Sequence, residues 1–495
     1  MKQPNIKLNY IYRTIYEILI VLIPLITTPY VSRVLGADGV GIYSYTSSIM
    51  TYFTLFAALG TATYGEREIA RNRDNKELAS KLFFEIELLT IITSSICILI
   101  WIMFILLSVE YRYYYIALMP LLFSTMADIS WFFSGYEQMK YIVLRNSLCK
   151  IVGVILLFSL VNEKNDLVTY MIINSVISLV GNLSMWTYLP KMIVKVDLHT
   201  LQLKKHFKET LIYFIPTIAT SIYTVLDKTL IGIITQDSFQ NGYYEQATKI
   251  INIVKSVVFT SLNVVMGARI SYLFMQKKYD EIKNRIERSI SFIFLLGYGS
   301  LFGIIAVANE FVPLFFGESY EPVISLLYVM SPLIIIIGIS NCLGTQYYTP
   351  AGLRLKSAKI IILGSFINLV CNLILIPKLG ANGAAIGSLI AELSITILYV
   401  IKCDGYLSLR VIIKYSYKRI IAGVIMLFII KLVDTFIILD ALFILLLEII
   451  IGLLVYFVVL FIMKDSLLIE MISLVLKYIV ALFKRGRDNN DRFES

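Results

Sequence analysis

The sequence predicts an all-α polytopic membrane protein with about 14 transmembrane helices. Three observations support this fold class. Hydrophobic residues make up 58% of the 495 residues, and the mean hydropathy is +0.79. Only 16% of the residues are charged, against about 25% in soluble proteins. The apolar residues fall in runs of about 20, and positive charge is concentrated in alternate loops.

Each apolar run is long enough for a helix to cross the hydrocarbon core of a bilayer. The runs are uninterrupted, whereas the strands of a membrane barrel alternate polar and apolar residues. They therefore predict helices. The expected spans are residues 10–32, 40–64, 82–107, 114–135, 141–161, 167–188, 210–235, 242–267, 289–308, 323–347, 358–377, 383–401, 418–436 and 440–463.

Lysine and arginine gather in every second loop. The loops after spans 2, 4, 6, 8, 10 and 12 are rich in both residues, whereas the other loops carry only Arg33, Arg112, Lys164, Lys378 and Lys431. By the positive-inside rule, the rich loops and both termini lie in the cytoplasm. Topology thus explains most of the net charge of +10, and we expect no nucleic-acid partner.

Spans 1–2 and 7–8 resemble each other. Gly41 to Ile49 reads GIYSYTSSI, Gly242 to Ile250 reads GYYEQATKI, and the preceding span contains proline in both cases. Spans 1 and 7 both start inside, so the repeats are parallel and related by a pseudo-two-fold axis along the membrane normal. The expected parts are an N-terminal six-helix lobe (1–190), a cytoplasmic basic linker (191–209), a C-terminal six-helix lobe (210–402), two additional transmembrane helices (403–463), and a cytoplasmic interfacial helix with a basic tail (464–495).

No motif for catalysis or nucleotide hydrolysis is present. The sequence contains no Walker A, HExxH or GxSxG pattern. The five cysteines are scattered, mostly within apolar runs, and the two histidines, His199 and His206, share one polar loop. We therefore expect a protein that is not an enzyme and that needs no metal or cofactor for chemistry.

The stretch from Tyr213 to Val258 carries the most informative charges. Span 7 holds Asp227 and Lys228, and span 8 holds Glu245 and Lys249. A charge at the bilayer centre costs about 2.5–3.5 kcal/mol on insertion scales, so such residues usually face a partner or a cavity. Two interpretations stay open. Asp227 and Lys228 neutralise each other, or the stretch lines a polar path for a charged cargo.

Other membrane-embedded charges are further candidates. Arg13 and Glu17 lie four residues apart in span 1 and share a helix face. Asp128 lies in span 4, directly before an aromatic run. Glu448 in span 14 lies outside the two repeats and has the weakest functional claim.

Several segments, in this order and spacing, carry a family resemblance. They are PYVSRVLG from Pro29 running into GVGIYSY, YGEREIA from Tyr64 with Arg73-Asp74, DISWFFSG from Asp128 with Glu137 and Lys140, the stretch Asp227 to Ile250, GTQ from Gly344, and PKLGANGAA from Pro377. On these residues the chain resembles bacterial polysaccharide flippases of the Wzx type, within the multidrug/oligosaccharidyl-lipid/polysaccharide exporter superfamily.

The resemblance implies two lobes that form a V around a cavity lined largely by spans 1, 2, 7 and 8. It implies alternating access that moves an undecaprenyl-diphosphate-linked oligosaccharide across the bacterial cytoplasmic membrane for surface or capsular polysaccharide. It also implies coupling to Na⁺, H⁺ or the membrane potential. The expected partners are the lipid-linked oligosaccharide, membrane lipids, and the polymerase and glycosyltransferases of the same process.

Cationic side chains in a cavity of low dielectric can hold a diphosphate. Lys249 is the first candidate. The other candidate cations are Lys228, Arg13 and Arg33. The carboxylates that are candidates for ion coupling, or for tuning those cations, are Asp227, Glu17, Asp128 and Glu245.

Two alternatives share the expected fold. A lipid II-type flippase would keep the diphosphate and differ in the glycan. A cation-coupled multidrug exporter would favour an acidic, aromatic cavity, whereas the expected site is at least as cationic as it is acidic. A polymerase or glycosyltransferase would need a large outer catalytic loop, and no outer loop exceeds about 14 residues.

Overall fold

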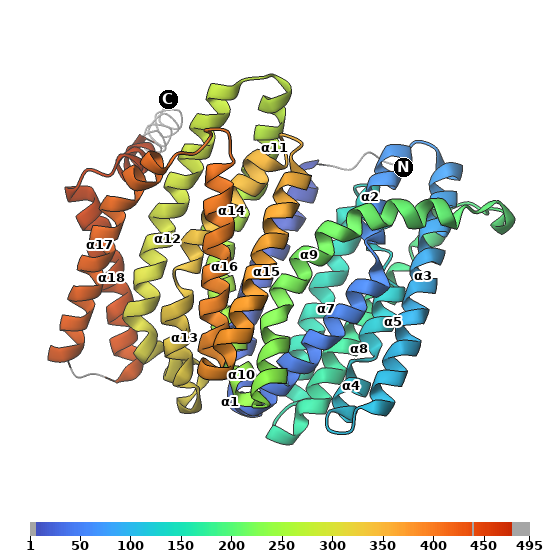
Figure 1. Cartoon of the computed structure of the whole chain (residues 1–495), viewed down its shortest axis with the longest axis horizontal. Coiled ribbons are helices and arrows are strands. Elements are labelled where there is room, and N and C mark those ends of the chain that lie inside the picture. Colours follow the sequence, from blue (N-terminus) through green and yellow to red (C-terminus); the bar gives the residue numbers. More distant parts are fainter. Residues whose placement is uncertain (1–5, 438–439, 478–495) are drawn as a thin grey trace, which may run out of the picture. The chain divides into compact units, whose positions relative to one another are not determined.

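A computed structural model describes residues 6–437 and 440–477 (Figure 1). These residues form helices and the turns that connect them, and no β-strand occurs among them. A helix satisfies its own backbone polar groups, as a segment within a bilayer must. The all-α prediction is therefore confirmed for this part of the chain.

The helices follow the apolar runs with several breaks. Two π-helical turns, Ser256–Thr260 and Gly344–Tyr348, follow α10 and α14. The helix bounds are α1 Ile6–Ala58, α2 Thr61–Asn72, α3 Lys76–Leu107, α4 Arg112–Leu118, α5 Pro120–Met126, α6 Ser130–Gly135, α7 Met139–Leu160, α8 Leu167–Met185, α9 Leu203–Thr235, α10 Ser238–Lys255, α11 Ser261–Met275, α12 Tyr279–Phe316, α13 Pro322–Met330, α14 Leu333–Leu343, α15 Arg354–Leu379, α16 Ala381–Ile401, α17 Leu409–Phe436 and α18 Ala441–Ile462.

Within the described residues, 10 helical segments are long and apolar enough to cross a membrane. One of them, Ile18–Asn72, takes in most of the expected spans 10–32 and 40–64. The expected spans at 210–235, 242–267 and 418–436 are helical as well, although they are not among these segments. The multi-span character is confirmed, and the count of fourteen stays a prediction.

Backbone geometry explains the breaks near the N-terminus. Gly36 has φ 69° and ψ 175°, so α1 consists of two helical segments on either side of this residue. Leu59 and Gly60 have φ of 44° and 73°, which no α-helix accommodates. The second segment therefore ends at Ala58, before the expected limit of span 40–64.

Contacts between residues divide the chain into two compact units. The first comprises residues 1–249, 315–326 and 361–391, and the second comprises 250–314, 327–360 and 392–495. Two buried apolar clusters lie in the first unit, one around Trp101 and one around Phe83. A third, around Met426, lies in the second unit. Compactness and internal repetition are different criteria, so the expected lobes 1–190 and 210–402 stay a prediction.

A buried ion pair in the second unit fastens the helix at residues 466–477. Arg419 in α17 is fully buried, donates to the backbone oxygen of Ser291 at 2.6 Å and lies 3.2 Å from Asp465. Asp465 also accepts from the N–H groups of Leu467 and Leu468, each at 3.1 Å, and so caps that helix. Arg419 is thus a residue of the protein core. The basic end expected for the tail lies outside the described residues.

The two related segments of the expected repeat approach each other closely at two glycines, Gly41 and Gly242. A Cβ on Gly41 would lie 1.7 Å from the carbonyl oxygen of Ser238, and one on Gly242 would lie 2.0 Å from that of Ala37. Ala37 precedes Gly41 by one helical turn, just as Ser238 precedes Gly242. Equivalent positions of the repeat therefore contact each other reciprocally, and this close backbone approach explains why both residues are glycine.

We expect Gly41→Ala to lower the thermal unfolding temperature of the detergent-purified protein. The added methyl group would push two backbones apart, and overpacking of this kind typically costs about 1–3 kcal/mol. Gly303→Ala is the matched control, because a Cβ at Gly303 in α12 meets nothing within 4 Å. That substitution should be neutral, or stabilising by up to about 1 kcal/mol. Equal effects of the two substitutions would contradict the close approach.

Candidate functional site

The candidate site lies on the hairpin formed by α9 and α10 in the first unit. Gln236 has φ 52°, and its N–H bonds the carbonyl oxygen of Gly232 at 3.1 Å, which ends α9 in a tight turn. The turn folds α10 back along α9. As a result, the adjacent residues Asp227 and Lys228 face the adjacent residues Tyr244 and Glu245 across the hairpin.

Asp227 is held in a cage of hydrogen bonds. Its side chain is 5% exposed, and its Oδ1 accepts from the amide groups of Asn372 at 2.7 Å and Asn368 at 3.1 Å. Its Oδ2 accepts from the hydroxyl groups of Tyr244 and Ser388. Four donors on α10, α15 and α16 thus surround one carboxylate, which offsets the cost of burying it.

Helical spacing explains how α15 and α16 supply this cage. Asn368 and Asn372 lie four residues apart on α15 and share one face of the helix. A Cβ on Gly387 of α16 would lie 2.5 Å from Oδ1 of Asn372, so this glycine lets the two helices approach closely. Oδ1 of Asn372 is buried and has no hydrogen-bond partner among the described residues. The cage therefore contains one hydrogen-bond acceptor, Oδ1 of Asn372, that receives no donor from the described residues.

Glu245 holds two lysines. Its Oε2 lies 2.6 Å from Nζ of Lys228 and accepts from the hydroxyl of Ser44 at 2.9 Å. Its Oε1 lies 3.7 Å from Nζ of Lys249, one turn further along α10. Lys228 therefore pairs with Glu245 rather than with Asp227, and the interpretation that Asp227 and Lys228 neutralise each other is wrong. Two cations share one carboxylate, so these three side chains by themselves carry one positive charge, and the neighbouring Asp227 carries a negative charge in its own cage.

Hydroxyl and amide groups extend this polar region along α1. Thr229 on α9 and Ser48 on α1 are hydrogen-bonded at 2.8 Å, and Tyr52 lies 3.2 Å from Thr229. Nearer the N-terminus of α1, Gln246 donates to the hydroxyl of Ser32 at 2.8 Å. The seam between α1 and the α9–α10 hairpin is therefore polar at several successive turns.

Of the remaining predicted residues, Arg33 and Asp128 take no part in the contacts of this seam given above. Arg33 is exposed and precedes the break at Gly36. Asp128 lies between α5 and α6, where it accepts from the N–H of Ser130 at 2.9 Å and lies 3.8 Å from Arg145. Its contacts are those of a residue that starts a short helix. The side chains of Arg13 and Glu17 lie outside the described part of the structure.

A buried histidine is one functional candidate that the sequence did not indicate. Nδ1 of His206 lies 2.8 Å from the hydroxyl of Tyr64, and its Nε2 lies 2.8 Å from Glu85. The other oxygen of Glu85 accepts from the N–H of Gln202 at 2.7 Å. These contacts tie the start of α9 to α2 and α3. Only the rarity of histidine in the sequence could have drawn attention to His206.

The partners of Asp227 were also missed, although a signal was present. Asn368 and Asn372 are amides four residues apart inside an apolar run, a pattern that predicts one polar helix face within the membrane. Together, the two clusters can bind ions of both signs. The lysines can hold an anionic group, and the oxygen-rich cage can hold a small hard cation.

Comparisons with known proteins show what the chain is similar to. The profile of a family described as "Polysaccharide biosynthesis protein" matches residues 6–267. The chain is 24% identical over 397 residues to a protein of Escherichia coli (strain K12) named "Putative O-antigen transporter", covering 79% of this chain and 95% of that protein. It is 25% identical over 209 residues to a protein of Haloferax volcanii named "Probable low-salt glycan biosynthesis flippase Agl15", with 42% of each chain covered.

Solved structures show the same fold at low identity. A lipid II flippase, MurJ, in an inward closed conformation superposes with a TM-score of 0.69 at 17% identity, covering 93% of this chain and 99% of that one. An inward-facing multidrug transporter of the MATE family gives a TM-score of 0.61 at 14% identity, covering 85% and 98%. These likenesses establish the fold.

We expect the two lysines to differ in their coupling to Glu245. Double-mutant cycles with Lys228→Met, Lys249→Met and Glu245→Gln, measured by chemical unfolding in detergent, would give each coupling free energy. For Lys228, a short charge-assisted bond predicts about 1.5–3 kcal/mol. For Lys249, the longer separation predicts below about 1 kcal/mol. A larger coupling for Lys249 would contradict the geometry.

Proposed function

Because the chain belongs to the polysaccharide biosynthesis protein family, we propose that it is a flippase that moves a lipid-linked oligosaccharide across a membrane by alternating access. More specifically, we propose that the cargo is an undecaprenyl-diphosphate-linked repeat unit. The protein carries it to the outer leaflet of the bacterial cytoplasmic membrane for surface or capsular polysaccharide. The names of its relatives, an O-antigen transporter and a glycan biosynthesis flippase, support this proposal.

The observation that carries the proposal is the pair of lysines on one carboxylate. Lys228 and Lys249 are partly exposed, and both lie within 4 Å of Glu245. A diphosphate is anionic, and charge-assisted bonds to it gain strength where water is excluded. Two lysines that share one carboxylate offer cationic groups to an anionic headgroup, which favours such a cargo over a cationic drug.

We propose that Glu245 pairs with the two lysines until the cargo binds. Without cargo, it compensates part of the charge of the two lysines. When the diphosphate arrives, its oxygens replace Glu245 at Lys249, where the separation of 3.7 Å makes the existing contact weak. Lys228 keeps its shorter bond to Glu245 and so stays in position. Lys249 is therefore the residue we expect to contact the diphosphate first.

The Asp227 cage is our candidate for ion coupling. A Na⁺ ion would be held by the carboxylate of Asp227, the hydroxyl of Ser388 and the unpartnered amide oxygen of Asn372, all hard oxygen ligands. A proton on Asp227 would instead weaken the bonds that its carboxylate accepts. Asp227 and Lys228 are neighbours on α9. Binding of an ion at Asp227 would therefore move or reorient Lys228, which belongs to the cargo site.

The proposal also defines what acts before and after the protein. Glycosyltransferases must build the lipid-linked unit on the cytoplasmic side, and a polymerase would consume it on the other side. Both termini then lie in the cytoplasm, as the loop charges predict. The two alternatives, a lipid II-type flippase and a cation-coupled multidrug exporter, predict different cargo in a reconstituted assay with matched lipid-linked substrates and cationic dyes.

We expect Lys249→Ala to abolish export of surface polysaccharide in a strain that lacks its own copy of the gene, and Lys249→Arg to retain part of it. Arginine keeps the positive charge, whereas alanine removes a contact to the diphosphate. Export is measured on cell extracts at equal protein level. Lys283→Ala, at an exposed position of α12, is the control and should export normally. Unchanged export in both Lys249 variants would remove this residue from the site.

We expect Asp227→Asn to uncouple transport from its ion gradient. The neutral amide preserves the size of the side chain but lacks the negative charge that attracts a cation, and it carries no transferable proton. Transport of a lipid-linked oligosaccharide into vesicles is measured with Na⁺ and H⁺ gradients imposed separately. The wild-type protein should respond to one of them, and the variant should respond to neither. A variant that still responds like the wild type would assign coupling elsewhere.

A further inference from the structure

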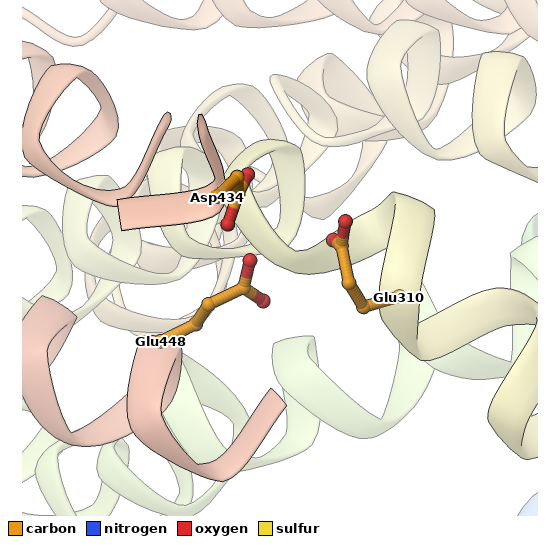
Figure 2. Close-up of side chains that lie close together, drawn as sticks. All are labelled: Glu310, Asp434 and Glu448. Atoms are coloured by element: carbon orange, nitrogen blue, oxygen red, sulfur yellow. The ribbon is translucent and has the colours of Figure 1, made fainter. Parts of the chain in front are cut away.

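Three acidic side chains converge in the second unit, two from consecutive helices and one from a helix much earlier in the chain. Glu310 lies on α12, Asp434 on α17 and Glu448 on α18, and Figure 2 shows their carboxylates pointing toward one another. One oxygen of each carboxylate lies within 4.8 Å of the other two. None of these residues belongs to the α9–α10 hairpin.

Glu448 supplies a second observation. Its side chain is 0% exposed, and neither of its carboxylate oxygens has a hydrogen-bond partner among the described residues. Oε2 of Glu310 and Oδ1 of Asp434 are likewise buried without a partner. A buried charge without a partner is too costly to persist, so a ligand or protons must compensate the oxygens that face one another here.

One lysine compensates only part of this charge. Nζ of Lys431 lies 3.0 Å from Oδ2 of Asp434, one turn further along α17. The nearby hydroxyl of Tyr328 donates to the side-chain oxygen of Asn309 at 2.9 Å and adds no charge. Three carboxylates and one ammonium leave two negative charges, which matches one divalent cation.

We propose that Glu310, Asp434 and Glu448 form a binding site for one divalent cation, with calcium as the best fit. Calcium binds carboxylate oxygens at about 2.3–2.6 Å, so two oxygens on opposite sides of one ion lie about 4.8 Å apart. A single cation at the centre of the cluster would contact all three carboxylates. One shared proton would join only two of them.

The position of the cluster favours calcium over magnesium. Magnesium requires ligands at about 2.0–2.1 Å in a near-ideal octahedron and keeps several waters, which suits a fully buried carboxylate such as Glu448 poorly. Asp434 lies near the end of α17, on the side that the loop charges predict to be outside. Calcium sites that face the outside of cells typically have dissociation constants of about 0.1–1 mM.

The site would join α17 and α18 to α12. These are the two helices that follow the expected lobes, and α17 and α18 also pack on each other around Met426 and Tyr456. A cation between the three helices would fasten this pair to α12 at a further place, in addition to the bonds from Arg419 to Ser291 and from Tyr456 to Leu295. This role is independent of the cargo and of the proposed flippase function.

The test is calcium binding to the purified full-length protein in detergent, after treatment with a chelator. Equilibrium dialysis with ⁴⁵Ca²⁺ should show one ion per chain with half-saturation between about 0.1 and 1 mM, and calcium should raise the thermal unfolding temperature. Glu448→Gln should weaken binding at least about tenfold and remove the calcium-dependent rise. Without calcium, this variant should be at least as stable as the wild type, because it lacks an uncompensated charge.

Asp440→Asn is the matched control. Asp440 is exposed and directly precedes α18, so this substitution makes the same change of charge outside the cluster and should leave calcium binding intact. If Glu448→Gln does not fold, Asp434→Asn provides the same test from α17. The proposal is overturned if the wild-type protein binds no calcium at 5 mM (about five times the weakest expected constant), if the cluster variants bind like the wild type, or if Asp440→Asn loses binding equally.

Discussion

Two parallel contacts across the α9–α10 hairpin determine the rest of the candidate site. Asp227 accepts from Tyr244, and the next residue on each helix, Lys228 and Glu245, forms an ion pair. Neither Lys228 nor Glu245 would be stable as a charged group in an apolar protein without the other. Because the two contacts occupy consecutive residues, the hairpin cannot slide without breaking both. Asp227 and the two lysines are thus parts of one rigid element.

Two glycines at matching positions of the expected repeat explain how this element contacts α1. Gly41 and Gly242 are equivalent in the repeat and bring the two backbones together symmetrically. The side chains around them are not symmetrical. Ser44 corresponds to Glu245 and donates to it, so an uncharged residue of one repeat supports the charged residue of the other. A common backbone framework therefore carries polar chemistry that is concentrated on the second repeat.

Much of the fold could be predicted from the sequence, because apolar runs and loop charges report directly on the membrane. Lys228, Glu245 and Lys249 could also be predicted as a group, since charges in an apolar run are costly. The choice of partners could not, because Asp227 is bonded from α15 and α16, more than a hundred residues away. The cluster around Glu448 could not be predicted for the same reason, because only the packing of α12 and α17 brings its two acidic neighbours near.

The glycine contact has a genetic consequence. The nearest atoms to a Cβ on Gly41 would be backbone atoms of α10, whereas a Cβ on Gly232 would meet the ring of Tyr45 at 2.1 Å. A smaller side chain at Tyr45 can therefore make room for a larger residue at position 232, and such pairs are free to co-vary among homologues. No truncation on α10 can relieve a larger residue at Gly41. Suppressors of defects at that position must shift a whole helix and should map far from the contact.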